Sequence, residues 1–404
     1  MAVEITLIRH GETIANAAEV WQGQGDSELS EVGRRQAKAL GARLDPSRFD
    51  RVLSSDLIRT VDTATLAGLD PEPRPEWREV DIGEWEGLTR PEVMERFPDE
   101  MAALAAGESP RLGGRGETWP EFHERIDRAF SDLIATARPG ERIALVVHGG
   151  VVHSVLTRGL GLARRFPWPV ERIHNTAISR VTASGDRTQL QVLNDASHTD
   201  WQPHRDGHGP TVTFVRHGET EANVAGLWQG RLDTPLTERG RAQAAELASW
   251  HRRPTVLYSS PTGRAQATAK YLADGSDVRI HPDIVEIDFG AWEGLDYEQA
   301  RAADPELWTR VYDGGEDLPR GRTGETFTAA GERMVAALAS IAAAHGDGGA
   351  VAVSHGGSIR SLVARVLGID FPERNRIGLP DNASSTTFRL GEAGPVLVDY
   401  NLRA

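Results

Sequence analysis

Two histidines, each followed by glycine, stand directly after short apolar segments of the sequence. His10 follows residues 5–8, and His148 follows a similar β-branched run. Such runs predict buried strands, and ligands of open α/β sheets bind beyond the carboxyl ends of the strands. Arg9 adjoins the first histidine, and Arg59 comes shortly after a third strand-like run. Two imidazoles and two guanidiniums at one sheet edge are suited to hold a phosphoryl group.

This set of residues predicts metal-independent chemistry at phosphorus. A neutral imidazole is a competent nucleophile, and nearby arginines lower its pKa and keep it neutral. The second imidazole can donate a hydrogen bond to the phosphoryl oxygens. Glu79, ahead of a glycine-containing loop, is the candidate that protonates the leaving oxygen and later deprotonates water. We expect no cofactor and no metal, because the protein supplies the cations.

Each residue also has a structural interpretation. An isolated Arg-His-Gly sequence at a strand end is usually structural, and His148 taken alone fits a satisfied buried histidine. Glu79 could simply end a loop, and Trp85 and Trp292 fit core positions. The chemical coherence of the whole set is what favours a site.

The set occurs twice. Arg9-His10-Gly11-Glu12-Thr13 returns 207 residues later as Arg216-His217-Gly218-Glu219-Thr220. A period of this length matches a whole domain and predicts a tandem duplication. We expect one domain over 1–199, a linker over 200–210 and a second domain over 211–404. The other pairs are Asn16 and Asn223, Gln22 and Gln229, Arg59 and Arg264, Glu79 and Glu286, His148 and His355, and Gly149 and Gly356.

The predicted linker is polar and rich in glycine, proline and histidine. Three histidines in and next to it could form a metal-binding tract, but their spacing is irregular and the segment offers no rigid scaffold. A solvated linker is therefore the favoured interpretation of His198, His204 and His208.

The elements that must position these residues alternate between strand and helix. Residues 31–44, after the potential N-cap Ser30, predict a helix with Val32, Ala39, Leu40 and Leu44 on one stripe. Short apolar strands between amphipathic helices predict a mostly parallel mixed sheet covered on both faces. The last two strands of the half should form a hairpin at the sheet edge. Each half is thus expected to be a three-layer α/β/α sandwich. The predicted strands of the first half are 5–8, 51–53, 143–147, 178–182 and 190–193.

Composition removes several classes of function. The 404 residues contain no cysteine, which excludes disulfides, thiolate metal sites and cysteine nucleophiles. Lys38 and Lys270 are the only lysines, so a P-loop or Schiff-base lysine is improbable. The net charge of −14 disfavours nucleic-acid binding. The sequence shows no signal peptide and no apolar run that would span a bilayer, so we expect a cytoplasmic protein without a membrane partner.

The motifs taken together resemble the histidine phosphatase superfamily, also called phosphoglycerate mutase-like. The resemblance rests on the Arg-His-Gly-Glu-Thr motifs, on Ser-Ser-x-x-x-Arg ending at Arg59 and Arg264, on the segments that begin at Glu79 and Glu286, and on the His-Gly-Gly motifs. It implies a phosphohistidine intermediate and a site in each half. The implied nucleophiles are His10 and His217, and the implied acid/base residues are Glu79 and Glu286. The implied phosphate pockets consist of Arg9, Arg59 and His148 with Arg216, Arg264 and His355, and less specifically of Asn16, Gln22, Asn223 and Gln229.

The family contains phosphatases and phosphomutases. A mutase protects its phosphoenzyme from water and usually needs a longer covering segment than residues 88–115 or 295–323 provide. We therefore favour hydrolysis of a small phosphomonoester in both halves. The alternatives are a phosphoglycerate mutase-like phosphotransferase and a chain in which one half only binds or stabilises. A monomer that is an intramolecular pseudo-dimer fits the repeat.

The covering segments differ most between the halves, so we expect the two sites to prefer different substrates. Glu117-Thr118 and Glu325-Thr326 close these segments, and either complete the pocket or cap a helix. His153 stands in the first half where the second has Arg360. A position on the helix surface is the favoured interpretation of this pair.

Overall fold

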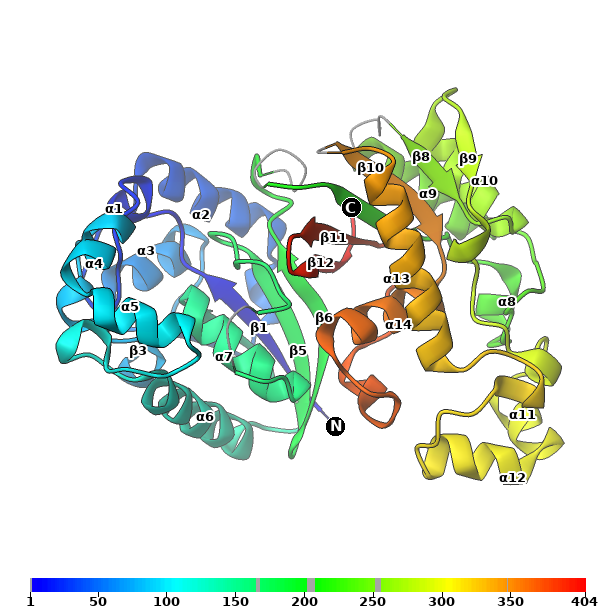
Figure 1. The fold of residues 1–404 in the computed structure, drawn as a ribbon, viewed down its shortest axis with the longest axis horizontal. Coiled ribbons are helices and arrows are strands. Elements are labelled where there is room, and N and C mark those ends of the chain that lie inside the picture. The colour runs from blue at the N-terminus through cyan, green and yellow to red at the C-terminus, as the bar shows by residue number, and fades with distance from the viewer. Residues whose placement is uncertain (1, 165–167, 202–207, 251–255, 347) are drawn as a thin grey trace. The chain divides into compact units, whose positions relative to one another are not determined.

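The computed structural model describes residues 2–164, 168–201, 208–250, 256–346 and 348–404. They divide into two compact units (Figure 1). The first comprises Met1–Trp168 and Arg172–Trp201, and the second comprises Pro169–Glu171 and Gln202–Ala404.

The first unit is an α/β sandwich whose sheet is mostly parallel. Its strands are β1 (Val3–Arg9), β2 (Arg51–Ser55), β3 (Glu72–Arg74), β4 (Arg142–Val147), β5 (Ile178–Ser184) and β6 (Arg187–Asp195). They are ordered β3-β2-β4-β1-β5-β6, and the first four of that order are parallel. The antiparallel pairing of β5 with β1 and with β6 makes the sheet mixed and confirms the predicted hairpin.

Helices cover the sheet of the first unit on both faces. α2 (Glu31–Arg43) and α3 (Ile58–Leu66) pack on one face through Leu40 and Ala64, which meet Ile8 and Val146 of the strands. α6 (Trp119–Thr136) and α7 (Gly149–Leu160) pack on each other, on the other side of β1 (Figure 1). Shorter helices are α1 (Ile14–Ala17), α4 (Arg90–Arg96) and α5 (Pro98–Ala105).

The predicted start of α2 is confirmed, because Ser30 accepts a hydrogen bond from the Gly33 backbone. The predicted apolar stripe is partly wrong. Leu40 is buried together with Gly33 and Ala37, whereas Val32 is exposed. Glycine faces inward because the helix lies close to the first motif loop: a Cβ at Gly33 would lie 2.0 Å from the Glu12 carbonyl oxygen.

The second unit repeats this plan. Its strands are β7 (Thr211–Arg216), β8 (Leu257–Ser259), β9 (Val278–Ile280), β10 (Gly349–Ser354), β11 (Ser385–Gly391) and β12 (Gly394–Leu402), ordered β12-β11-β7-β10-β8-β9. β7, β10, β8 and β9 are parallel, and β11 pairs antiparallel with β7 and β12. The helices are α8 (Glu221–Val224), α9 (Glu238–Trp250), α10 (Gly263–Ala273), α11 (Tyr297–Ala303), α12 (Pro305–Trp308), α13 (Phe327–Ala343) and α14 (Gly356–Leu367).

The units differ in the segment that precedes the long helices α6 and α13. In the second unit this segment continues from α12 into a π-helix, Thr309–Asp313. Trp308 and Tyr312 of this segment pack on Trp228 and Trp292, with ring centroids 5.6–6.1 Å apart. Trp292, like Trp85 in the first unit, is 1% exposed, which confirms the core interpretation of both tryptophans.

Candidate functional site

The first histidine of each unit is buried at the end of the central strand and has a defined tautomer. His10 follows β1, and its Nδ1 atom lies 2.7 Å from the Gly11 carbonyl oxygen. His217 follows β7 with a 2.8 Å contact to the Gly218 carbonyl oxygen. A carbonyl oxygen only accepts, so Nδ1 carries the proton and Nε2 keeps its lone pair. In both units Nε2 is therefore the ring nitrogen whose lone pair is available for attack on a ligand.

Burial and neighbouring arginines keep these two imidazoles neutral. Desolvation, then Arg59 and Arg9, lower the pKa of His10 well below its usual value. For His217, desolvation, then Arg216 and Arg264, lower the pKa in the same way. A neutral ring is the form that can attack phosphorus.

The second histidine of each unit presents an unpartnered ring nitrogen. His148 lies with its ring centroid 5.3 Å from that of His10, and Arg59 Nε donates to its Nδ1 over 3.3 Å. Its Nε2 therefore carries the proton, and this atom is buried without a partner. In the second unit the centroids of His217 and His355 are 5.2 Å apart, and the buried atom without a partner is His355 Nδ1.

Arg9 and Arg216 each present a buried Nε–H group that has no acceptor among the described residues. Each holds its side chain in place by a 2.6 Å bond from Nη1, to the Ile173 carbonyl in the first unit and the Pro380 carbonyl in the second. Buried donors are nearly always paired in folded proteins. An anion seated between this Nε–H group and the second histidine would supply the missing acceptors.

The second arginine of each pocket is held by the loop that follows the first motif. Arg59 donates to the Gly23 and Gly25 carbonyls, and Arg264 donates to those of Gly230 and Leu232. Sequence reasoning gave the Trp-Gln-Gly segments no such role. The units also differ here, since Arg264 Nε lies 3.3 Å from His217 Nε2. In the second unit this guanidinium therefore donates to the His217 nitrogen that carries the lone pair.

Glu79 and Glu286 lie at the N-termini of α7 and α14, where backbone N–H groups stabilise a carboxylate. Glu79 Oε2 accepts from the Gly150 N–H over 2.9 Å. Glu286 accepts from Gly357 over 3.1 Å and from Ser358 over 2.8 Å. Sequence reasoning therefore placed both carboxylates correctly beside the histidine motifs.

The His-Gly-Gly motifs are needed for close packing at these helix starts. A Cβ at Gly150 would lie 2.3 Å from Glu79 Oε1, which no real contact allows. A Cβ at Gly149 would lie 3.5 Å from Arg9 Nε, and one at Gly356 would lie 3.1 Å from Arg216 Nε. The first glycine of each motif thus makes room for the arginine, and the second makes room for the glutamate.

The four predicted amides are already committed in part to the loop. The Asn16 side-chain oxygen accepts from Thr13 and Asn175, and that of Asn223 accepts from Thr220 and Asn382. Their Nδ2 groups are the donors left for a ligand. Gln22 instead accepts from the Thr13 hydroxyl and donates to the Gly25 carbonyl over 3.4 Å, and Gln229 bonds the hydroxyls of Thr220 and Thr234. The two glutamines brace the helix caps, and their part in phosphate binding stays a prediction.

Sequence reasoning missed an arginine behind each acid/base residue. Arg125 donates to the Glu79 carbonyl over 3.1 Å and to the Arg78 carbonyl over 2.9 Å, and Glu117 receives two of its hydrogen bonds. Arg333 and Glu325 form the same pair in the second unit. The signal was the eight-residue spacing, which puts a glutamate before the helix and an arginine on its second turn. Thr118 and Thr326 are confirmed as helix caps, and Glu117 reaches Arg125 through its carboxylate.

The predicted helix-surface position of His153 and Arg360 is wrong. His153 is 5% exposed and lies 4.2 Å from Trp168 between ring centroids. Arg360 donates to the Arg374 carbonyl over 2.7 Å, and its Nε atom is buried. Both side chains turn inward because the third residue after each His-Gly-Gly motif contacts the neighbouring segment, at Trp168 in the first unit and Arg374 in the second.

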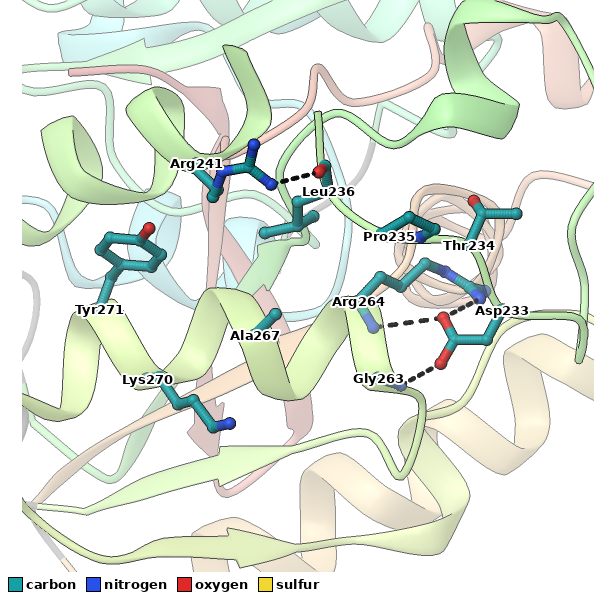
Figure 2. Close-up of a pocket in the computed structure, with 10 residues that line it drawn as sticks. All are labelled: Asp233, Thr234, Pro235, Leu236, Arg241, Gly263, Arg264, Ala267, Lys270 and Tyr271. Atoms are coloured by element: carbon teal, nitrogen blue, oxygen red, sulfur yellow. Dashed lines mark hydrogen bonds and ion pairs between the residues drawn. The ribbon is translucent and has the colours of Figure 1, made fainter. Parts of the chain in front are cut away.

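A separate cavity of about 680 Å³ lies in the second unit beside α10 (Figure 2). It adjoins the site through Arg264, which pairs with Asp233 over 3.2 Å. Asp233 also accepts from the Gly263 backbone at the start of α10. Lys270 and Tyr271 line the opposite side and are exposed.

A solvated linker was the favoured interpretation of His198, His204 and His208, and the structure describes two of these residues. His204 lies outside the described residues. His198 Nε2 lies 2.9 Å from the Thr176 hydroxyl, and burial lowers the pKa of His198 to about 4. Across the ranges given above, no three acidic or histidine side chains gather as a metal site would require. In the same ranges, no helix is long and apolar enough to cross a membrane.

Known proteins share these features. The family model described as "Histidine phosphatase superfamily (branch 1)" matches residues 5–196 and again 212–403. "Phosphoglycerate mutase-like protein 4" of Arabidopsis thaliana is 33% identical over 205 residues, 49% of this chain and 87% of the relative. "Phosphoserine phosphatase 1" of Hydrogenobacter thermophilus is 32% identical over 195 residues, 47% of this chain and 92% of the relative.

A solved structure, phosphoserine phosphatase from Entamoeba histolytica with phosphoserine, is 28% identical. It covers 48% of this chain and 96% of its own, with a TM-score of 0.45. The two family-model matches span nearly the whole chain and include every residue of both histidine sites. The chain therefore belongs to the histidine phosphatase superfamily and is a phosphatase.

Proposed function

We propose that each unit holds a complete active site that hydrolyses a small phosphomonoester through a phosphohistidine. The carrying observation is a buried arginine Nε–H group without an acceptor beside a buried histidine ring nitrogen without a partner, which occurs in both units: Arg9 Nε with His148 Nε2, and Arg216 Nε with His355 Nδ1. No residue of the set is replaced in either copy. Relatives named for phosphoserine and phosphoglycerate chemistry support a small phosphorylated metabolite as substrate.

The reaction takes two displacements at phosphorus. His10 Nε2 attacks the phosphorus, the ester P–O bond breaks, and protonated Glu79 gives its proton to the leaving alkoxide. Arg9, Arg59 and His148 hydrogen-bond the phosphoryl oxygens as their charge rises. Glu79, now a carboxylate, takes a proton from water, whose oxygen attacks phosphorus and breaks the P–N bond. Inorganic phosphate leaves, and Glu79 is protonated again.

The same measurements distinguish the proposal from the two alternatives. A phosphotransferase of the phosphoglycerate mutase type would pass the phosphoryl group to a second hydroxyl before water reached it. A chain with one active half would lose all turnover when the nucleophile of that half is replaced. It would lose none when the corresponding histidine of the other half is replaced. The phosphotransferase alternative differs from the proposal in its product, and the alternative with one active half differs in the activity of the single variants.

The test uses the full chain with His10→Ala, His217→Ala and both together, assayed on a panel of phosphomonoesters. His208→Ala, at an exposed histidine, is the control. We expect a partial loss in each single variant, complete loss in the double variant, and one acid-labile phosphoryl group trapped per remaining histidine. Complete loss from one single variant would contradict two active sites. Conversion of 3-phosphoglycerate to 2-phosphoglycerate faster than phosphate release would support the phosphotransferase.

A further inference from the structure

The second unit contains a buried group of three arginines that the phosphate pocket does not use. Arg320 is 3% exposed and Arg374 is 8% exposed. Their guanidinium carbons lie 4.5 and 3.8 Å from the centroid of the Phe371 ring. Arg360 joins them by its bond to the Arg374 carbonyl. We call Arg320, Arg360 and Arg374 the arginine cluster.

The charge of the arginine cluster is not balanced by the protein. Among the residues that the structure describes, one carboxylate forms an ion pair with the cluster. This is Asp317, which pairs with Arg320 over 3.1 Å. Arg360 and Arg374 use carbonyl and amide oxygens instead. Unpaired charge is costly to bury. Burial lowers the pKa of Arg374 to about 10, so the group stays charged at neutral pH.

Arg360 connects the cluster with the phosphate pocket. It lies four residues after Gly356, on the helix face that Gly356 presents to Arg216. Its Nη2 atom donates to the Arg374 carbonyl over 2.7 Å, and Arg360 and Arg216 both act electrostatically on the buried Tyr400 hydroxyl. Its Nε–H group is buried and has no acceptor. This is the same sign of an absent anion that marks Arg216.

The first unit has neutral rings in the corresponding place. His153 stands where the second unit has Arg360, and it lies against Trp168. His123 is close by, with its Nδ1 atom 2.9 Å from the Ser154 hydroxyl and its ring against Trp119. Burial lowers the pKa of both histidines to about 4, so neither carries charge at neutral pH. The residue one helical turn after the pocket is therefore neutral in the first unit, as His153, and cationic in the second, as Arg360.

We propose that the arginine cluster is a second anion-binding subsite, so that the second unit acts on phosphomonoesters that carry another acidic group, while the first unit does not select for one. The inference rests on the proposed function of the second unit and adds its substrate class. The acidic group is a carboxylate or a second phosphate a few bonds from the scissile phosphorus, because one turn of α14, about 5.4 Å, separates Gly356 from Arg360. It would accept from Arg360 Nε and offset the unbalanced charge.

The test compares substrates that differ in the acidic group alone. 3-Phosphoglycerate and glycerol 3-phosphate differ by a carboxylate, and propanediol bisphosphate and 3-hydroxypropyl phosphate differ by a phosphate. The His10→Ala protein reports the second unit, and the His217→Ala protein reports the first. We expect the acidic-to-neutral ratio of kcat/KM to be at least about tenfold higher in the second unit. The pair that shows the higher ratio identifies the acidic group.

Substitutions then assign the ratio to the cluster. Arg360→His, which introduces the first unit's residue, should lower the ratio about tenfold in the second unit, and Arg360→Lys should retain part of it. His153→Arg should raise the ratio in the first unit. Arg365→His, at an exposed arginine on the same helix, is the matched control and should leave the ratio unchanged.

Equal ratios in the two units, or a ratio unaffected by Arg360→His in folded protein, would overturn the subsite. Failure of the proposed function looks different, because the His10→Ala protein would then turn over neither member of a pair. In that case, calorimetric titration of His10→Ala with 3-phosphoglycerate, with and without Arg360→His, still decides the subsite. Unchanged affinity would refute it, and an affinity lost with Arg360 would support it.

Discussion

Replacing Arg125 should disable proton transfer in the first unit while leaving phosphate binding in place. Arg125 donates to three backbone carbonyls, those of Glu76, Arg78 and Glu79, over 2.9–3.1 Å, and to both oxygens of Glu117. At about 1 kcal/mol for each net hydrogen bond, Arg125→Met forfeits roughly 3 kcal/mol of support for the segment that carries Glu79. Glu79 can then leave the position that its bond to Gly150 defines.

The size of the effect depends on the leaving group. A general acid contributes about 10²–10⁴-fold, so partial misplacement of Glu79 should cost about 10–100-fold on an alkyl phosphate. p-Nitrophenolate leaves without protonation, and p-nitrophenyl phosphate should therefore lose much less. We expect this split in the His217→Ala background, measured as kcat/KM on glycerol 3-phosphate and on p-nitrophenyl phosphate.

Arg128→Met is the matched control, because Arg128 lies on the same helix and its side chain is 71% exposed. It should change neither rate. Thermal unfolding of each variant establishes that the protein is folded at the assay temperature. An equal loss on both substrates would mean that Arg125 serves structure alone, and no loss on either would refute its positioning role.

Three further predictions follow from the same contacts. In the His217→Ala background, Gly150→Ala should lower kcat/KM at least about 100-fold, because its Cβ would lie 2.3 Å from Glu79 Oε1. Gly149→Ala, whose Cβ would lie 3.5 Å from Arg9 Nε, should lower kcat/KM less than about tenfold. Similar losses in the two variants would contradict this prediction. His153 has a folded-state pKa of about 4 against an ordinary 6.5, so the unfolded chain binds the proton first and stability falls as the pH drops from about 6.5 to 4. Urea unfolding at pH 6.5 and at pH 4 measures this fall in the free energy of unfolding. The fall should be smaller in His153→Phe by on the order of 3 kcal/mol, and an unchanged pH dependence would refute the prediction. Inorganic phosphate should raise the melting temperature, because it would bind the unpaired Nε–H groups of Arg9 and Arg216. The rise should be smaller in Arg9→Gln than in the parent protein, and smaller again in the double variant with Arg216→Gln. Equal rises in all three proteins would show that phosphate binds elsewhere.

Local pattern was enough to predict five of the six strands of the first unit, the helix that starts after Ser30 and the position of His10 and His148 at strand ends, but it missed β3, which has no apolar run. This worked because the motifs follow buried strands directly, so chain connectivity alone carries His10 and His148 to one sheet edge. The 207-residue repeat extended the same reasoning to the second unit without further information. Absent cysteine and scarce lysine already restricted the nucleophile and the anion-binding groups to histidine and arginine.

Contacts between segments distant in sequence needed the tertiary structure. The tautomer of His148 depends on Arg59, 89 residues away, and the support of Glu79 depends on Arg125, 46 residues away. Val32 was expected to face the core, but the inward side of α2 is set by the close approach of Gly33 to Glu12. The helical period predicts which residues share a face of a helix, but not which segment packs against that face. For the same reason, His153 and Arg360 were wrongly predicted to lie on the helix surface. The sequence thus determined which groups are the candidates for the chemistry. Packing between distant segments decided their protonation, their support and the unbalanced charge of the arginine cluster in the second unit.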